Sequence, residues 1–295
     1  MKFKFWGVRG SIPSPGAHTV RYGGNTTCIE VRGNDGTLII LDGGTGIFAL
    51  AQALLRELPV KANIFITHSH WDHIHGLPFF IPLFIPGNSV RFYGAFNPVS
   101  GSGIEQVMAV QLQYSYFPVR EAEMKAAIEY ETLTIGQTVE VGDCTVTNTL
   151  LNHPVIDFGY RIECDGKSMF FTGDHEPYYN IYDPSDEDYA EYQALIEDKQ
   201  AAVDQAMRGV DALIVDTSYT REEYPGKLGW GHGYFDASIA MAQRVGAKRL
   251  YCTHHEPTRS DDELETVFAQ VMARHEPQLQ GLEVFLAREG LELEL

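Results

Sequence analysis

The chain has 295 residues, 44% hydrophobic and 21% charged, which is typical of a globular protein with a substantial core. Its formal net charge of −18 works against an extended nucleic-acid interface, because binding phosphates needs clustered Lys and Arg. Four scattered cysteines without a C-x-x-C pair exclude a disulfide framework and favour free thiols in a reducing cytosol. No signal sequence and no membrane-spanning apolar segment are recognised, so we expect a cytoplasmic protein with no membrane partner.

The N-terminal third is predicted to contain short strands joined by glycine-rich turns. Four strands are predicted, at 2–8, 26–31, 37–41 and 62–66. The second and third would form a hairpin around residues 33–36. After Asp42, apolar residues recur at helical spacing from 47 to 55, and Gly76–Phe80 predicts the start of a packed helix.

The rest of the chain interleaves strands with helices. Strands are predicted at 90–93, 139–151, 158–163, 168–171, 212–215 and 248–252. Helices are predicted at 104–112, 186–208 and 236–245, and after a capping box at 260–263. Ser185 is the predicted cap of the acidic helix, with Tyr189, Ile196 and Met207 on its inner face. With no repeat or linker, this pattern predicts one domain, residues 1–295, of the α/β or α+β class.

A dense cluster of metal-ligating side chains follows the strand at 62–66. The pattern H-x-H-x-D-H lies at a strand-to-helix turn and supplies His68, His70, Asp72 and His73. The first two histidines are two residues apart, so an extended backbone places them on one face, while the other two residues lie beyond the bend. Imidazole and carboxylate together suit zinc, manganese or iron, so the pattern predicts a metal site and not a group of surface histidines.

This pattern, followed by Gly76, resembles the signature of the metallo-β-lactamase-fold hydrolases. The rest of that family's motif series is similar to three later segments that each follow an apolar run: Asn152-His153-Pro154, Thr172-Gly173-Asp174 and Thr253-His254-His255. The resemblance spans nearly the whole chain, from Phe5 to the C-terminal third. Gly229-Trp230-Gly231-His232 most resembles the ribonuclease Z and cyclic-nucleotide phosphodiesterase branch. The resemblance implies a four-layer αββα metallo-β-lactamase sandwich.

The resemblance also implies two divalent metal ions held by residues from distant parts of the chain. One ion would be bound by His68, His70 and His153, the second by Asp72, His73 and His254, and Asp174 would bridge the two. Zinc is the expected metal, with manganese or iron as alternatives. Two ions about 3.5–4 Å apart would share a hydroxide as the nucleophile, with Asp72 counted among the catalytic residues. His254 is chosen over His255 because the family's ligand directly follows the Thr.

His232 is the second predicted catalytic residue. It lies in a glycine-rich loop and is not needed to complete either set of ligands. By resemblance to the phosphodiesterase branch, it would contact the phosphate and donate a proton to the leaving oxygen. The family usually has Ser or Thr after this histidine, where this chain has Gly233, so a hydroxyl contact is lost. A capping or buried histidine is the alternative role.

Four further residues are candidates for supporting the ligands or touching substrate: Asp42, Asp216, His255 and Asn25. The two aspartates each end an apolar strand, where they would accept the second N–H of an imidazole or simply terminate the strand. Asn25 lies in a loop that resembles one near the family's metals, with hydrogen bonding at a strand start as the alternative. Trp71 and His75 are predicted to pack. The aromatic segment 114–117 is predicted as core packing or as one wall of a substrate cleft.

The leading hypothesis for function is a dinuclear metal-dependent phosphodiesterase that acts on small cyclic or linear nucleotides, with no large nucleic acid as partner. Only twenty residues separate His153 from Asp174, too few for a tRNA-gripping insertion, so tRNA 3′ processing is the weaker alternative. A second alternative is hydrolysis of a thioester or lactone at the same site. His232 argues against it, because a proton donor directed at a phosphate has less use in that reaction. A non-hydrolytic member, either a diiron oxygen-chemistry enzyme or a non-catalytic metal-binding sensor, is the third. The sequence leaves open the substrate, the metal and the oligomeric state, including a homodimer.

Overall fold

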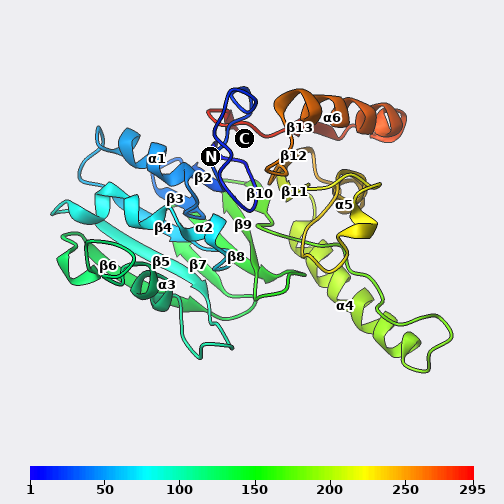
Figure 1. Cartoon of the computed structure of the whole chain (residues 1–295), viewed down its shortest axis with the longest axis horizontal. Helices are drawn as coiled ribbons and strands as arrows, with labels where there is room; N and C mark the ends of the chain where they lie inside the picture. The colour runs from blue at the N-terminus through cyan, green and yellow to red at the C-terminus, as the bar shows by residue number, and fades with distance from the viewer.

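The computed structural model describes residues 1–295, with every side chain except that of residue 276. Two seven-stranded sheets pack face to face, and helices cover both outer faces, with α1 and α3 on one side and α4, α5 and α6 on the other (Figure 1). The predicted α/β class and the four-layer αββα sandwich are therefore confirmed. No helix of the described residues combines the length and the apolar character needed to cross a membrane.

The first sheet is built from the N-terminal half and the last strand of the chain. In spatial order it contains β14 (Glu292–Glu294), β1 (Lys2–Gly7), β2 (Cys28–Arg32), β3 (Leu38–Leu41), β4 (Lys61–Phe65), β5 (Ser89–Ala95) and β6 (Ala127–Leu133). Strand β14 pairs antiparallel with β1, so the two termini lie side by side (Figure 1).

The second sheet is built from the C-terminal half. In spatial order it contains β13 (Glu283–Leu286), β12 (Arg249–Thr253), β11 (Ala212–Asp216), β10 (Lys167–Phe171), β9 (Phe158–Cys164), β8 (Cys144–Leu150) and β7 (Thr138–Val141). The helices are α1 (Gly46–Leu54), α2 (Trp71–Ile74), α3 (Glu105–Gln111), α4 (Tyr189–Met207), α5 (Phe235–Val245) and α6 (Asp261–His275). Short 3₁₀ turns are η1 (Leu77–Phe79), η2 (Ile81–Phe84), η3 (Glu121–Glu123), η4 (Tyr224–Gly226) and η5 (Glu276–Gln278).

Alternation along the strands creates three apolar layers. In β11, Ile214 faces the core between the sheets, whereas Leu213 and Val215 face the outer helices. Because both faces are covered, the strand is a continuous buried apolar run. Between the sheets, Phe3 of β1 meets Tyr251 of β12 edge to face, with ring centroids 5.5 Å apart. The sheets are thereby fixed against each other by aromatic contacts in the central layer.

Strand direction brings the loops that carry the predicted site residues to one edge. Strands β3 to β6 are mutually parallel, as are β10 to β13. Strand β8 also runs in the direction of β10, because each is antiparallel to β9. The segments after β4, β8, β10 and β12 therefore leave the two sheets at the same edge. Their side chains meet there although the segments are far apart in sequence.

A buried arginine ties the N-terminal loop to the segment after β12. Arg9 donates from Nε to Gly23 O at 2.8 Å and from Nη1 to Arg259 O at 2.8 Å. Its Nη2 also lies 3.2 Å from Asp261 Oδ1 at the start of α6. These bonds satisfy the fully buried guanidinium and hold the segment after β12 against the N-terminal loop.

Several predicted elements differ from the structure in ways that follow from backbone chemistry. The predicted strand 139–151 is a hairpin, β7 and β8, which turns at Gly142 with φ at 60°. The helix expected from Gly76 is replaced by η1 and η2, because Pro78 and Pro82 lack the N–H that a continuing helix needs. The edge strands β13 and β14 and the strand β6 were missed, since they alternate polar and apolar residues only weakly or are very short.

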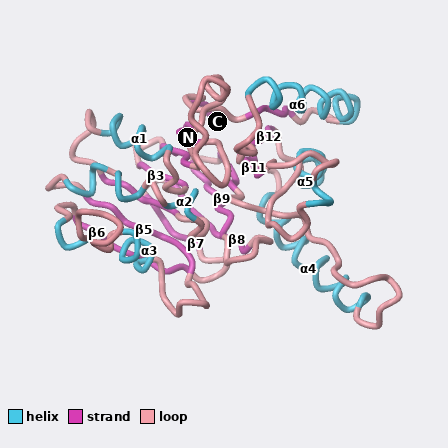
Figure 2. The backbone as a smooth tube through the Cα atoms, in the orientation of Figure 1, coloured by secondary structure: helices cyan, strands magenta, loops and turns pink.

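The acidic helix is also shorter than predicted. It begins at Tyr189, and Ser185 does not cap it, because the Ser185 hydroxyl donates to Asp183 at 2.7 Å. Ile196 and Met207 are buried, whereas Tyr189 is half-buried. The N-terminal half of α4 projects beyond the strands (Figure 2). This half of the helix has little of the core to pack against, which explains why most of its side chains are polar.

Candidate metal centre

The structure brings seven metal-ligating side chains from four segments together at one edge of the sheets. The donor atoms of the first set all lie within 4.8 Å of one another, and the set comprises His68, His70, His153 and Asp174. The second set meets the same limit and comprises Asp72, His73, His254 and, again, Asp174. Two donor groups that share one carboxylate can hold two adjacent cations, because each oxygen of the shared group can face one ion.

The first turn of α2 places four of these donors. His70 precedes the helix with an extended backbone, φ −64° and ψ 150°, and α2 begins at Trp71. His68 and His70 therefore leave an extended segment, while Asp72 and His73 leave the helical turn. The change of backbone conformation within six residues is what divides the motif between the two donor sets.

Each histidine in the centre of the cluster is oriented by an acceptor on its outer nitrogen. His73 Nδ1 lies 2.7 Å from Asp42 Oδ2, and Asp42 also accepts the Thr67 N–H at 2.8 Å. His68 Nδ1 is hydrogen-bonded to the Thr67 hydroxyl at 3.1 Å and lies 2.8 Å from Asp157 Oδ1. The inner nitrogens, Nε2, are thereby left facing the cluster, as in metal sites where carboxylates position ligating imidazoles.

His153 is oriented by backbone instead of by a carboxylate. Its Nδ1 donates to Gly231 O at 2.8 Å. Burial lowers the pKa of His153 to about 4, and it also lowers the pKa of His68 and of His70. These three imidazoles are consequently neutral near pH 7, the protonation state in which histidine binds a metal.

Buried atoms without hydrogen bonds provide a test of whether these residues fit metal ions. Nε2 of His68, Nε2 of His73 and Oδ1 of Asp174 are all buried and make no hydrogen bond. Leaving a buried polar atom unsatisfied costs about 1–3 kcal/mol, and such atoms are rare in folded proteins. These three atoms come from two distant segments, residues 68–73 and Asp174, and all are of types that bind zinc, so they fit a divalent cation.

His232 lies beside the shared carboxylate. Its Nδ1 is 2.9 Å from Asp216 Oδ2 and 3.6 Å from Asp174 Oδ2, and its ring stacks on His254 with centroids 4.8 Å apart. Burial alone would lower the pKa of His232, but the two carboxylates outweigh it and raise the pKa to about 9. The imidazole is therefore held protonated next to the donor cluster, which suits it to proton donation.

The absence of a Ser or Thr hydroxyl at Gly233, directly after His232, has a steric cause. A Cβ on Gly233 would lie 2.5 Å from Asp216 O, which is too close for any side chain. Ser218 supplies a hydroxyl here instead, donating to Asp216 Oδ1 at 2.6 Å. Its Oγ also lies 2.9 Å from His254 Nδ1. Ser218 was missed in the sequence, where only its position two residues after Asp216 hints at a role.

Two of the weaker candidates lie outside the cluster. His255 is fully buried with Nε2 2.8 Å from Ala287 O, so it supports the loop and does not reach the donors. His254 has φ at 57°, and this left-handed conformation turns the two adjacent imidazoles in different directions. Asn25 donates from Nδ2 to Glu289 Oε2 at 3.0 Å, so its side chain fastens the N-terminal loop to the C-terminal segment.

The aromatic residues predicted to pack are mostly exposed. Trp71 is 80% exposed, and it lines a large cleft together with Tyr116, which is 76% exposed. Phe117 is half-buried and meets Phe79 edge to face, with centroids 5.4 Å apart. The prediction that Trp71 packs is wrong, and the aromatic segment forms a wall of the cleft while only Phe117 packs inward.

Glu176 is a further residue that the sequence did not reveal, and it fixes the loop that carries His232. Its carboxylate is 3% exposed and accepts the Gly229 N–H at 2.8 Å and the Gly231 N–H at 2.9 Å. It also accepts the Tyr224 hydroxyl at 3.0 Å. Because Gly231 O orients His153 and His232 follows directly, this clamp positions residues on both sides of the cluster.

A family model, related sequences and solved structures all match this chain. The model of the beta-lactamase superfamily domain matches residues 37–255. The ribonuclease BN of Cronobacter sakazakii is 26% identical over 92% of this chain and 95% of that protein. The structure of unliganded yeast PDE1 superposes with a TM-score of 0.70 at 17% identity, covering 100% of this chain and 99% of that one. Zn(2+)-bound PqqB from Methylobacterium extorquens superposes with a TM-score of 0.68 at 18% identity, covering 100% of both chains.

We expect Glu176→Ala to loosen the 229–231 loop. Hydrogen bonds to a charged acceptor contribute about 1.5–3 kcal/mol each, so amide exchange at Gly229 and Gly231 should accelerate by about tenfold or more. Hydrogen exchange followed by mass spectrometry or NMR measures this directly. Tyr224→Phe is the matched control, because it removes one hydroxyl donor and leaves both amide bonds to Glu176. Equal exchange in both variants and in the wild type would contradict the clamp.

Proposed function

The chain belongs to the beta-lactamase superfamily and is a hydrolase of the ribonuclease Z and phosphodiesterase type, and we propose that it is a dinuclear metal-dependent phosphodiesterase acting on small cyclic or linear nucleotides or similar diesters. The observation that carries this proposal is the pair of donor sets that share Asp174, with buried nitrogens and an oxygen left without hydrogen bonds. A shared carboxylate between two adjacent cations is the arrangement used to hydrolyse phosphodiesters.

In this proposal every donor has a distinct part. His68, His70 and His153 would hold one zinc ion, Asp72, His73 and His254 would hold the second, and Asp174, which belongs to both donor sets, would serve both ions. When bound, the two ions supply Lewis acidity toward the phosphoryl oxygens and an activated water. Asp72 is held in place by the backbone, because its Oδ2 accepts the Ser11 N–H at 2.7 Å.

His232 is proposed to act on the leaving oxygen. Asp216 accepts from its Nδ1, which leaves Nε2 as the free N–H of a protonated ring. A proton donated from that nitrogen would neutralise the alkoxide that forms as the P–O bond breaks. After donation, Asp216 favours return of the ring to the protonated form, since its Oδ2 lies 2.9 Å from Nδ1.

Processing of tRNA 3′ ends is the second candidate, and the names of the ribonuclease relatives favour it. The charge of this chain favours a smaller substrate. The net charge is −18, and Lys199 is the one Lys or Arg among the described residues that line the large cleft beside His68 and His153. A long polyanion would find few cations there to replace its counterions.

The first prediction of this proposal concerns metal content. The reconstituted protein should bind about two zinc ions per chain, measured by elemental analysis after dialysis. Asp174→Ala should reduce the occupancy of both sites, because both donor sets include this carboxylate, whereas His70→Ala should chiefly weaken one. Circular dichroism checks that each variant is folded. A folded wild type that retains no metal, or an Asp174→Ala protein that retains two ions, would contradict the dinuclear site.

A second prediction concerns the substrate. Bis(p-nitrophenyl) phosphate and cyclic mononucleotides should be hydrolysed by the zinc-loaded protein, and precursor tRNA should be processed poorly because cations are scarce along the cleft. The Asp174→Ala protein, prepared identically, controls for contaminating nucleases. Efficient trimming of tRNA 3′ ends without turnover of any small diester would establish the second candidate instead. Turnover of thioesters or lactones alone would move the protein to another reaction class.

The third prediction assigns His232 as the proton donor. His232→Ala should keep both metals and lower kcat by about a hundredfold, the usual contribution of a well-placed general acid. The loss should be larger for a strongly basic alkoxide leaving group than for p-nitrophenolate, which departs readily without a proton. Steady-state kinetics on both kinds of diester measure the difference. Equal losses would indicate that His232 positions the phosphate, and an unchanged kcat would remove it from the reaction.

A further inference from the structure

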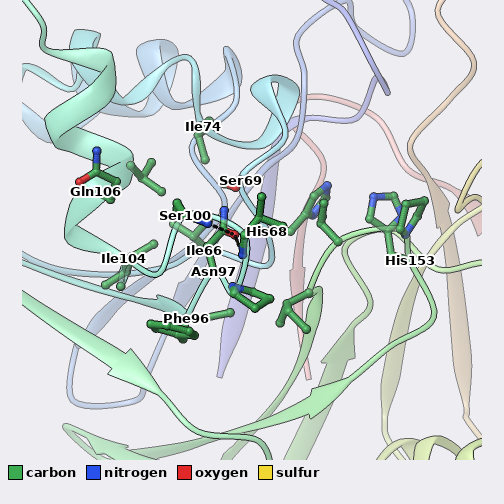
Figure 3. A pocket seen from close by; sticks show the side chains of 18 of the residues that line it. Ile66, His68, Ser69, Ile74, Phe96, Asn97, Ser100, Ile104, Gln106 and His153 are labelled. Carbon is green, nitrogen blue, oxygen red and sulfur yellow. Dashed lines mark hydrogen bonds between the residues drawn. The ribbon is translucent and has the colours of Figure 1, made fainter.

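A large apolar cleft opens directly from the candidate metal centre. It has a volume of about 1510 Å³ and is lined by His68 and His153 at one end and by α3 at the other. Figure 3 shows Ile66, Phe96 and Ile104 on one side of His68, with His153 on the opposite side. Ligand pockets for drug-sized molecules usually measure about 300–1,000 Å³, so this cleft has room for a group larger than a single nucleotide.

The lining of the cleft exposes an unusual amount of apolar surface. Val99 is 93% exposed, Trp71 is 80% exposed, and Tyr116, Phe79, Ile135 and Val110 are also exposed. Isolated apolar residues on a surface need no explanation, but a contiguous group around one concavity marks a binding site for an apolar ligand. Because the same concavity includes His68 and His153, that ligand would be continuous with whatever group reacts at the metal centre.

Two asparagines of the cleft, Asn97 and Asn148, already make hydrogen bonds to the backbone. Asn97 Oδ1 accepts the N–H of Val99 at 2.9 Å and the N–H of Ser100 at 3.3 Å. Asn148 accepts the Gly136 N–H at 2.8 Å and donates to Thr134 O at 2.9 Å. The oxygens of these two amides are already engaged, and the surrounding apolar surface can be covered by hydrocarbon.

We propose that the natural substrate is an amphipathic phosphodiester, whose phosphate binds at the metal centre and whose extended apolar chain lies in the cleft toward α3. This inference rests on the proposed phosphodiesterase function and adds the chemical class of the substrate. The apolar group of the substrate contributes affinity by leaving water. The described lining residues include no Asp, Glu or Arg and a single Lys, Lys199, so little charge is desolvated on binding.

The test uses p-nitrophenyl alkyl phosphodiesters with methyl, butyl and hexyl groups, assayed below micelle-forming concentrations with the full-length zinc-loaded protein. We expect kcat/KM to rise by at least about tenfold from methyl to hexyl. The ceiling is about fourfold per fully buried methylene, equivalent to ~0.8 kcal/mol each. A ratio near one between the hexyl and methyl substrates would overturn the proposal.

Matched valine variants locate the effect in the cleft. Val110→Asp and Val99→Asp place a charge on the lining and should lower the hexyl-to-methyl ratio by at least about threefold. Val20→Asp is the control, because Val20 is an exposed valine that does not line the cleft. Two cleft variants guard against misfolding of either one. An equal hexyl-to-methyl ratio in all three variants and the wild type would overturn the placement of the substrate's alkyl group in this cleft.

Binding measurements separate failure of this inference from failure of the proposed function. If no diester is hydrolysed, the phosphodiesterase proposal fails, and calorimetry with methylphosphonate and hexylphosphonate then decides the inference. Tighter binding of hexylphosphonate that is weakened by Val110→Asp supports an amphipathic ligand. Equal binding of the two phosphonates overturns it. If diesters are hydrolysed without dependence on chain length, the function stands and the amphipathic substrate is rejected.

Discussion

The structure depends on a buried carboxylate that imidazoles from four segments surround. Asp174 is 1% exposed, and its Oδ1 lies 3.2 Å from His73 Nε2 and 3.1 Å from His254 Nε2. Its Oδ2 lies 3.6 Å from both His68 Nε2 and His232 Nδ1. Nitrogens and oxygens at these distances, several without hydrogen bonds, are stable together when a cation lies between them. Folding of the two sheets and filling of this centre are therefore linked.

The fold holds these groups through a surrounding layer of acceptors that each end a strand or close a loop. Asp42 and Asp216 follow β3 and complete β11, while Glu176 fixes the glycine loop after η4. Asp42 takes φ at 61°, a conformation that Asp tolerates better than most residues and that aims its carboxylate at His73. Since these acceptors are anchored by backbone, the imidazoles are oriented before any ligand arrives, which reduces the entropy cost of binding.

The site residues that could be predicted from the sequence were those whose role depends on the spacing of neighbouring residues. H-x-H-x-D-H places four donors within six residues, and Asp42 and Asp216 stand where apolar strands stop. Asp157 and Glu176 were missed, because their partners, His68 and the 229–231 amides, are distant in sequence and meet them only through the sheet order. The direction of His255 and Asn25, which face away from the donor cluster, could not be predicted, because which way a loop residue faces depends on backbone angles that composition does not encode.

Two features of the chain act on substrates at different distances. The net charge of −18 repels polyanions, but salt limits such repulsion to about 8 Å at physiological ionic strength. In the proposed function, selection among small diesters would therefore come from contact within the cleft, where Trp71, Val99 and Tyr116 offer apolar surface. Binding energy from a group that does not react can hold the phosphate at the metal centre in a reactive orientation. For the proposed amphipathic substrate, an apolar cleft joined to a charged centre would thus make the part that does not react a determinant of rate.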